Sequence, residues 1–337
     1  MISEDTVKPS WLPRVKDFAV PDSRAAARQL INTLLPYFAL LALMYLTIRW
    51  GSPVWVPLVL SVPAALFMVR SFILFHDCSH GSFLKSKRAM TVIGTFLGIL
   101  TFTPYATWRC CHGIHHATVG NLDRRGVGDI WTMTVQEYRA TTRFGRFKYR
   151  LYRNPLVLFV LGPVYLFLIK NRFPDKAAKQ DKVRSVLVTN LAILAIALVC
   201  AFTIGLRAYL LIQLPILFFA AMGGIWLFYV QHQFDPSYWA RSNDWQSFAA
   251  CMRGSSFYKL PPVLQWFSAN IGLHHIHHLA PRIPNYRLQA CLNAIPDLHL
   301  PDAITLSHSF SAIYLNLWDE VDKKLVSFRS LRAATPA

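Results

Sequence analysis

Two apolar runs stand almost end to end in the chain: "VRSVLVTNLAILAIALVCAFTIGL" (183–206) and "AYLLIQLPILFFAAMGGIWLFYV" (208–230). Each is close to the roughly 20 residues that an α-helix needs to cross a bilayer. Only Arg207 separates them, so we expect a helical hairpin that turns around this residue. An earlier pair, 30–50 and 54–75, has the same form around a "GSP" turn. The sequence therefore predicts an all-α integral membrane protein with four spans in two hairpins.

The composition agrees with this class. Apolar residues make up 54% of the 337 residues and charged residues 15%, whereas soluble domains carry about 25% charged residues. Arg70 interrupts the second run, but near its end, where a long side chain can reach the membrane surface. Two shorter stretches, 90–107 and 155–169, are broken by Pro and Gly, and we expect them to lie at the membrane surface. Residues 1–26 read as a cytosolic tail and 27–337 as a single domain.

The basic residues are placed unevenly. The chain holds 35 Lys and Arg against 17 Asp and Glu. If the hairpins are the only crossings, the two far-side turns hold only Arg49 and Arg207, and the other 33 basic residues share one side. This is the asymmetry of the positive-inside rule. It predicts a multi-pass protein of the cytoplasmic membrane with both termini in the cytosol, and nucleic acid is not needed to explain the charge.

Ten of the twelve histidines fall in four clusters, each next to a predicted span or in a polar segment on the same side. The clusters are "HDCSH" (His76, His80), "HGIHH" (His112, His115, His116), "QHQ" (His232) and "HHIHH" (His274, His275, His277, His278). Residues three and four apart share one face of a helix, so HxxxH offers two imidazoles to one point and HxxHH offers three. Only His299 and His308 stand apart. This pattern predicts metal binding in a cytosolic helical cap.

Nine aligned imidazoles exceed the ligand number of any single ion, since zinc takes about four. Two metals in one pocket is the economical interpretation. Imidazole suits iron, copper, nickel and zinc, so ligand type alone does not choose among them. Carboxylate-bridged di-iron bundles need four glutamates, and this chain has only Glu4, Glu137 and Glu320.

Longer segments around these clusters resemble a known family. The segments "HDCSHGSF", "WRCCHGIHHATVGNLDRRGVGDIWTMTVQEY", "FYVQHQF" and "GLHHIHHLAPRIPNY" resemble the histidine boxes of integral-membrane fatty acid desaturases, with the bacterial acyl-lipid Δ12 and Δ5 types closest. The resemblance runs from the first span to about Tyr286. It implies two non-haem iron ions, O2 as co-substrate, and removal of two hydrogens from a fatty acyl chain.

Carried over residue by residue, the resemblance implies nine iron ligands: His76, His80, His112, His115, His116, His232, His274, His277 and His278. His275 occupies a variable position of the third box and is not expected to bind iron; we favour an accidental neighbour over a hydrogen-bonding partner of the ligands. Ligating histidines usually donate their second N–H to a carboxylate or a carbonyl. The aspartates near the boxes are candidates for this role: Asp77, Asp123, Asp129 and Asp235.

The resemblance also implies a lipid-linked or other fatty acyl substrate and a separate electron donor such as ferredoxin, because no fused haem or iron–sulfur segment is evident. A hydroxylase, an acetylenase or a ketolase of the same family remains an alternative. Trp108, Trp131, Tyr138 and Trp226 are candidates for the walls of an acyl tunnel, although ordinary packing is the commoner role of such aromatics.

Two other classes of membrane protein fit this sequence poorly. A membrane metalloprotease uses HExxH, but "HDCSH" has aspartate in place of the glutamate, and the predicted spans lack the histidines of a haem-binding or metal-transporting bundle. Near the C-terminus, Ile313, Leu317, Val321 and Leu325 recur every four residues, which predicts a packed amphipathic helix.

Overall fold

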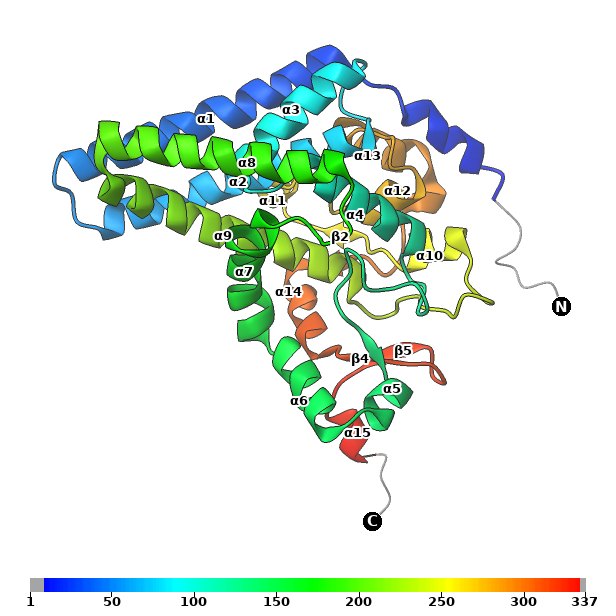
Figure 1. Cartoon of the computed structure of the whole chain (residues 1–337). Helices are drawn as coiled ribbons and strands as arrows, with labels where there is room; N and C mark the ends of the chain where they lie inside the picture. Colours follow the sequence, from blue (N-terminus) through cyan, green and yellow to red (C-terminus); the bar gives the residue numbers. More distant parts are fainter. Residues whose placement is uncertain (1–8, 334–337) are drawn as a thin grey trace.

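The computed structural model describes residues 9–333, and most of them lie in helices (Figure 1). The four longest are α1 (Ser23–Arg49), α2 (Trp55–His80), α8 (Gln180–Cys200) and α9 (Leu206–His232). By length and composition, three helical stretches could cross a membrane: α1, α2 and the 53-residue stretch Gln180–His232, which contains both α8 and α9. The described part of the chain therefore has the long apolar helices of a membrane protein.

The stretch Gln180–His232 folds back on itself. A π-helical turn, Ala201–Gly205, ends at Gly205, whose φ of +88° is open to glycine and strained for other residues. Figure 1 shows α8 and α9 side by side, with their turn at the same end of the molecule as the turn between α1 and α2. The two predicted hairpins are present, and the second one turns at Gly205, two residues before Arg207.

Two shorter helix pairs are sharply bent. The helices α3 (Lys87–Leu100) and α4 (Tyr105–Thr118) meet at 99°, and α6 (Arg143–Tyr152) meets the helical stretch Val157–Arg172 at 60°. This stretch comprises a π-helical turn (Val157–Leu161), α7 (Gly162–Leu168) and a 3-10 turn (Lys170–Arg172). If each bent pair were one span, the protein would have up to five. Four crossings, with 90–107 and 155–169 at the surface, stay a prediction.

The remaining elements form a cap around the ends of α2 and α9 that lie away from the hairpin turns (Figure 1). Its helices are α5 (Val135–Ala140), α10 (Ser247–Arg253), α11 (Pro262–Phe267), α12 (His274–Leu279), α13 (Asn285–Ala294), α14 (Leu306–Ser309) and α15 (Ser330–Ala333), with 3-10 turns at Leu12–Phe18, Pro296–Leu298 and Phe310–Tyr314. Its strands are β1 (Met133–Thr134), β2 (Tyr258–Lys259), β3 (Ile304–Thr305), β4 (Leu317–Asp319) and β5 (Lys324–Val326). The fold is mostly helical, and the strands are very short.

The prediction of a C-terminal amphipathic helix is wrong. Strand β4 pairs with β5 in an antiparallel hairpin and with β1 in parallel, so the sheet order is β1-β4-β5. Leu317 and Leu325 are buried, as a strand face requires, whereas Val321 is 79% exposed in the turn. A spacing of four is also an even number, so it fits the two-residue period of a strand as well as a helical turn.

The bundle core lies between α1, α2 and α9. Its buried members include Tyr37, Met44, Ala64, Met68, Ile216 and Ala220. Arg70 of α2 does not reach the surface as the sequence suggested, because its side chain is 3% exposed. It hydrogen-bonds the Thr33 hydroxyl and the Trp266 carbonyl, and its guanidinium lies 4.0 Å from the centre of the Trp266 ring. This arginine therefore joins the bundle to α11.

The predicted N-terminal tail lies partly outside the described residues, which begin at residue 9. Residues Leu12–Phe18 form a 3-10 turn, and Val15 is buried against Ile276, Leu288 and Cys291 of the cap. Helix α1 begins at Ser23, inside the range predicted as tail, where the Asp22 carboxylate accepts hydrogen bonds from the first free N–H groups. The described part of the tail therefore packs behind the last histidine cluster.

Candidate metal centre

The histidine clusters lie on four helix segments that meet under the cap. His76 and His80 are in the last turns of α2, and His232 is the last residue of α9. Helix α4 carries His112, His115 and His116, and the short helix α12 carries His274, His277 and His278. Since α2 and α9 pack together and the two short helices approach their ends, clusters almost 200 residues apart come together.

The structure divides these nine side chains into two groups that could each hold a metal ion. In the first group the ligand atoms of His76, His80, His112, His116 and His277 lie within 4.8 Å of one another. The Nε2 atom of His116 is 3.0 Å from Nε2 of His112 and 3.0 Å from Nε2 of His277. Three ring nitrogens from two helices thus point at one place.

The second group consists of His115, His232, His274 and His278, and it satisfies the same 4.8 Å limit. The Nε2 atom of His232 is 3.1 Å from Nε2 of His115 and 3.0 Å from Nε2 of His274. Nε2 of His278 lies 3.1 Å from that of His274. All four residues are buried. Neighbours in sequence are divided between the groups: His115 and His116 face different groups, as do His277 and His278.

The hydrogen bonds of the second group leave Nε2 lone pairs that a metal ion could use. Nδ1 of His115 is 2.6 Å from Asp129 Oδ1, and Nδ1 of His232 is 3.1 Å from the Gly254 carbonyl oxygen. Both oxygens only accept, so both Nδ1 atoms carry the proton. The two Nε2 atoms of the neutral rings then face each other with lone pairs at 3.1 Å. A metal ion beside them turns this repulsion into ligation, so the residues fit a metal.

Burial favours the neutral form of five further histidines of the two groups. It lowers the pKa of His274, His277 and His278 well below the usual value, and neighbouring imidazoles lower it further. Burial likewise lowers the pKa of His112 and His116, followed by the effect of the other rings. A neutral imidazole is the form that binds metal. These five imidazoles are therefore in the form that can bind a metal.

Two of the four candidate aspartates contact ligand-type histidines. Asp129 accepts from His115 and also from the backbone N–H of Gly126, at 3.2 Å. Oδ1 of Asp77 is 3.3 Å from Nδ1 of His76, and its Oδ2 accepts from the backbone and side-chain N–H groups of Asn285, at 2.7 and 2.8 Å. Both carboxylates are thus held by a second partner that fixes their orientation.

The other two aspartates lie elsewhere. Asp123 accepts from Arg241 and from the backbone N–H of Ser242. Asp235 is exposed and makes no hydrogen bond to a histidine within residues 9–333. Both residues are near histidines in the sequence, but they lie in loops that lead away from the histidine groups. The prediction that they contact the ligand histidines is therefore wrong.

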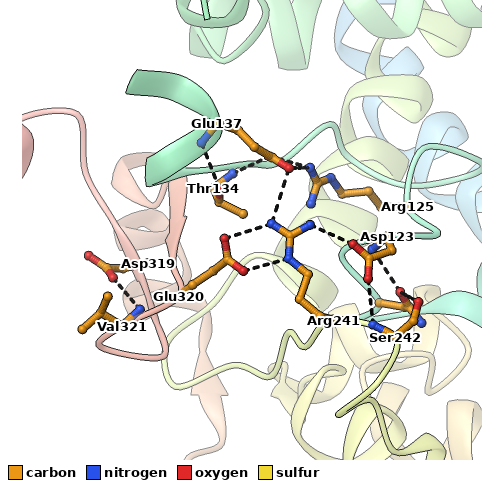
Figure 2. A network of polar contacts seen from close by, with 10 residues as sticks. Asp123, Arg125, Thr134, Glu137, Arg241, Ser242, Asp319, Glu320 and Val321 are labelled. Atoms are coloured by element: carbon orange, nitrogen blue, oxygen red, sulfur yellow. Dashed lines mark hydrogen bonds and ion pairs between the residues drawn. The ribbon is translucent and has the colours of Figure 1, made fainter. Parts of the chain in front are cut away.

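Figure 2 shows the network that contains Asp123. Arg241 binds Glu320 at 2.8 Å and Asp123 at 2.7 Å, and Arg125 binds Glu137 at 2.5 Å. These partners join the loop after α4, the loop after α9 and the β4–β5 hairpin. The side-chain hydrogen bonds to Arg241 lower the pKa of Glu320. The network holds the segment that carries Asp129, and no histidine of the two groups belongs to it.

His275 does not join either group. Its ring is fully buried, its Nε2 donates to the Leu298 carbonyl oxygen at 2.9 Å, and it lies 5.5 Å from the Phe257 ring centre. It therefore packs against Leu298 and Phe257 and belongs to neither histidine group. Among the four aromatic candidates, Trp108 stacks on His112 at 4.2 Å. The other three pack against aromatic rings outside the two groups.

Sequence reasoning missed several residues that hold the ligands. Gln231 donates to the Ile271 carbonyl oxygen just before α12, and Gln233 lies between Arg153 and Thr132. Asn285 positions Asp77 from the opposite end of the chain. The glutamines that flank His232 and the "PNY" after the third cluster were visible in the sequence. Their partners were not, because these contacts join distant segments.

Fold and site together define a class: a helical membrane protein in which two groups of histidines could each hold a metal ion. Residues 53–306 match the family model described as "Fatty acid desaturase". The chain is 46% identical over 319 residues to a "Fatty acid desaturase" of Bacillus subtilis (strain 168), covering 95% of this chain and 90% of that protein. The chain belongs to the fatty acid desaturase family, and it is an oxidoreductase that acts on fatty acids.

More distant relatives are also desaturases. The chain is 27% identical over 274 residues to an "Omega-3 fatty acid desaturase, endoplasmic reticulum" of Nicotiana tabacum, covering 75% of this chain and 68% of that protein. It is 28% identical over 238 residues to the "sn-1 acyl-lipid omega-3 desaturase (ferredoxin)" of Synechocystis sp., covering 66% and 63%. These relatives do not single out a Δ12 or Δ5 subtype, so that part of the resemblance stays a prediction.

Proposed function

We propose that this protein uses O2 and two electrons to convert a CH2–CH2 unit of a lipid-linked acyl chain into a cis or trans CH=CH unit, with release of two waters. The observation that carries the proposal is the convergence of nine imidazoles into two groups at the histidine end of the bundle. The reaction balances because the two hydrogens taken from the chain, two electrons and two protons together reduce one O2 to two waters.

Two iron ions fit the two groups. His76, His80, His112, His116 and His277 would hold one, and His115, His232, His274 and His278 the other. When bound, the irons supply the oxidising power that an unactivated C–H bond requires. The absence of a glutamate among these ligands favours the histidine type of di-iron centre over the carboxylate type.

The chain's own residues prepare this site. Asp129 and the Gly254 carbonyl hold the protons of His115 and His232 on Nδ1, so that Nε2 faces the metal. Asp77 does the same for His76, and Asn285 holds Asp77. The burial of both groups excludes bulk water, which protects a strongly oxidising reaction from side reactions. Trp108 covers one face of His112.

The substrate and the electron donor are inferred from different observations. The long apolar helices and the acyl-lipid name of the Synechocystis relative support a membrane lipid as substrate. The word ferredoxin in the same name supports a separate iron–sulfur donor. Arg49 ends α1 and Arg207 follows the first residue of α9, so both lie at the hairpin turns, with the other basic residues elsewhere. This supports a cytoplasmic membrane with the metal site on the cytosolic side.

The test is expression in a desaturase-poor bacterial host together with a ferredoxin system. Fatty acid methyl esters are analysed by mass spectrometry with double-bond location, and iron per chain is measured on the purified protein. His277→Ala and His274→Ala each remove a ligand from one group. His308→Ala is the matched control, because His308 is exposed and lies outside both groups.

We expect a new unsaturated acid with the unaltered chain and with His308→Ala, and neither product nor full iron content with the other two variants. A hydroxylated, acetylenic or keto product would instead assign the alternative outcome of the same family. Retention of two irons and full product in His274→Ala would refute the assignment of the second group.

A further inference from the structure

Helix α6 presents an apolar stripe to the outside of the protein. Phe144, Phe147 and Leu151 are 69%, 60% and 50% exposed. They stand at positions i, i+3 and i+7, so they share one face of the helix. The opposite face carries Tyr149, which is fully buried against Tyr138 and Leu317. Exposed apolar residues in a row mark a contact surface more often than isolated ones do.

Cations flank this stripe on both edges. At 100° per residue, Arg143 and Arg150 fall on one side of it and Lys148 falls on the other. Eight Lys and Arg and no acidic residue stand between Glu137 and Asp175. No carboxylate lies within ion-pair distance of Arg143 or Lys148 in the described part of the chain. The surface is therefore apolar in the middle and positive at its edges.

The apolar surface continues from α6 toward the bundle. Leu156, Leu161 and Tyr165 are 61%, 56% and 56% exposed along the following helical stretch. On its inner side, Phe159 packs on Trp226 and Tyr229, with ring centres 5.1 and 5.0 Å apart, near the histidine end of α9. Figure 1 shows α7 and α6 leading away from the long helices rather than along them.

We propose that α6 lies in the surface layer of the bilayer, with Phe144, Phe147 and Leu151 among the acyl chains, and that Arg143 and Lys148 bind anionic phospholipid headgroups. A basic amphipathic helix with aromatic residues on its apolar face is the form that binds anionic membrane surfaces. Continuity with the exposed apolar residues of the bundle favours lipid over a protein partner, because the same layer already surrounds the long helices.

This placement fixes the height of the metal site relative to the lipid. Directly after α6, the buried Arg153 donates to the Tyr229 hydroxyl at 3.1 Å and to the Gln233 side-chain oxygen at 3.0 Å. Gln233 follows His232, so one side chain links α6 to the end of α9. A helix held at the bilayer surface thereby holds the second histidine group at a constant depth.

The test is photo-crosslinking of the full-length protein in nanodiscs of phosphatidylcholine with phosphatidylglycerol. A benzoylphenylalanine replaces Phe147 in one variant. It replaces Leu191, 64% exposed on the long helix α8, as the positive control, and Val321, 79% exposed in the β4–β5 turn, as the matched negative control. Adducts are identified by mass spectrometry, which does not depend on catalytic activity.

We expect phospholipid adducts at 147 and 191 and none at 321. At 147 the share of phosphatidylglycerol among adducts should exceed its share of the bilayer. The double substitution Arg143→Gln/Lys148→Gln should return it to the bulk share. Lipid adducts at 191 with none at 147 would overturn the proposal, and so would adducts at 147 to an added acidic protein or to a second copy of this chain. If the double substitution left the share of phosphatidylglycerol among the adducts at 147 unchanged, the headgroup assignment would be overturned.

Discussion

Asp129 controls which nitrogen of His115 carries the proton, so Asp129→Asn tests the role of the second histidine group. The carboxylate serves two donors at once, Nδ1–H of His115 and N–H of Gly126. An asparagine side chain has one oxygen and one NH2 group. If the oxygen stays with Gly126, the NH2 faces His115 and its ring proton moves to Nε2, where a metal would bind. If the amide is reversed, two donors oppose each other at Gly126.

The size of the effect follows from burial. The side chains of His115 and Asp129 are 1% and 8% exposed, so solvent screens their 2.6 Å contact little. A hydrogen bond to a charged group contributes about 1.5–3 kcal/mol. At roughly 1.4 kcal/mol per factor of ten, iron affinity in the second group should fall about 10- to 100-fold, the range found when partners of ligating histidines are replaced.

The measurement is iron content of the purified protein along a titration with a ferrous chelator. One of the two irons should leave at a chelator concentration about 10- to 100-fold lower than in the unaltered chain. Asp235→Asn is the control, because Asp235 stands close after His232 in the sequence but makes no hydrogen bond to a histidine in the part of the chain that the structure describes. An unchanged midpoint in a folded Asp129→Asn variant would refute the reasoning.

Three further predictions follow from contacts outside the two groups. His275→Ala should keep full iron content and lower the free energy of unfolding by about 1–3 kcal/mol, because it leaves a buried carbonyl without its donor; iron loss equal to that of a ligand variant would contradict this. Arg241→Gln should lower the melting temperature at pH 7 by a few degrees without loss of iron, through about 1 kcal/mol of ion-pair energy. Since Arg241 lowers the pKa of Glu320 in the folded state, this stabilisation is present above the ordinary value of 4.5 and is lost below it. The unaltered chain and Arg241→Gln should therefore converge in melting temperature as the pH falls below about 4.5; a constant difference would contradict the prediction. Gly272→Ala should abolish folded protein, since the new Cβ would lie 2.3 Å from the Tyr258 carbonyl oxygen, whereas Gly113→Ala, which meets no atom within 4 Å, should express normally.

The elements that depend on local sequence were predictable. Runs of about 20 apolar residues determine long helices whatever surrounds them, because a helix satisfies its own backbone groups within one segment. The histidine spacings were predictable for the same reason, since i, i+3 and i+4 share a helical face. The nine candidate ligands are the nine side chains that converge in the structure. Their role as iron ligands stays a prediction.

The C-terminal hairpin was not predictable in this way. Leu317 and Leu325 fit a helix and a strand equally well. Pairing of β4 with β1, whose Met133 lies opposite Leu317, decides for the strand. A short strand has no internal hydrogen bonds, so it forms only where another segment supplies them. The same holds for Asp123 and Asp235, whose loops turn away from the histidines.

The sequence by itself determined which residue types gather at the histidine end of the bundle and that their number exceeds one ion's needs. Only the tertiary structure decided how they are divided. His115 and His116 lie about 100° apart on α4. His116 joins the histidines of α2, His115 joins His232 of α9, and α12 contributes to both groups. That division depends on the packing of helices from distant parts of the chain, and no local spacing encodes it.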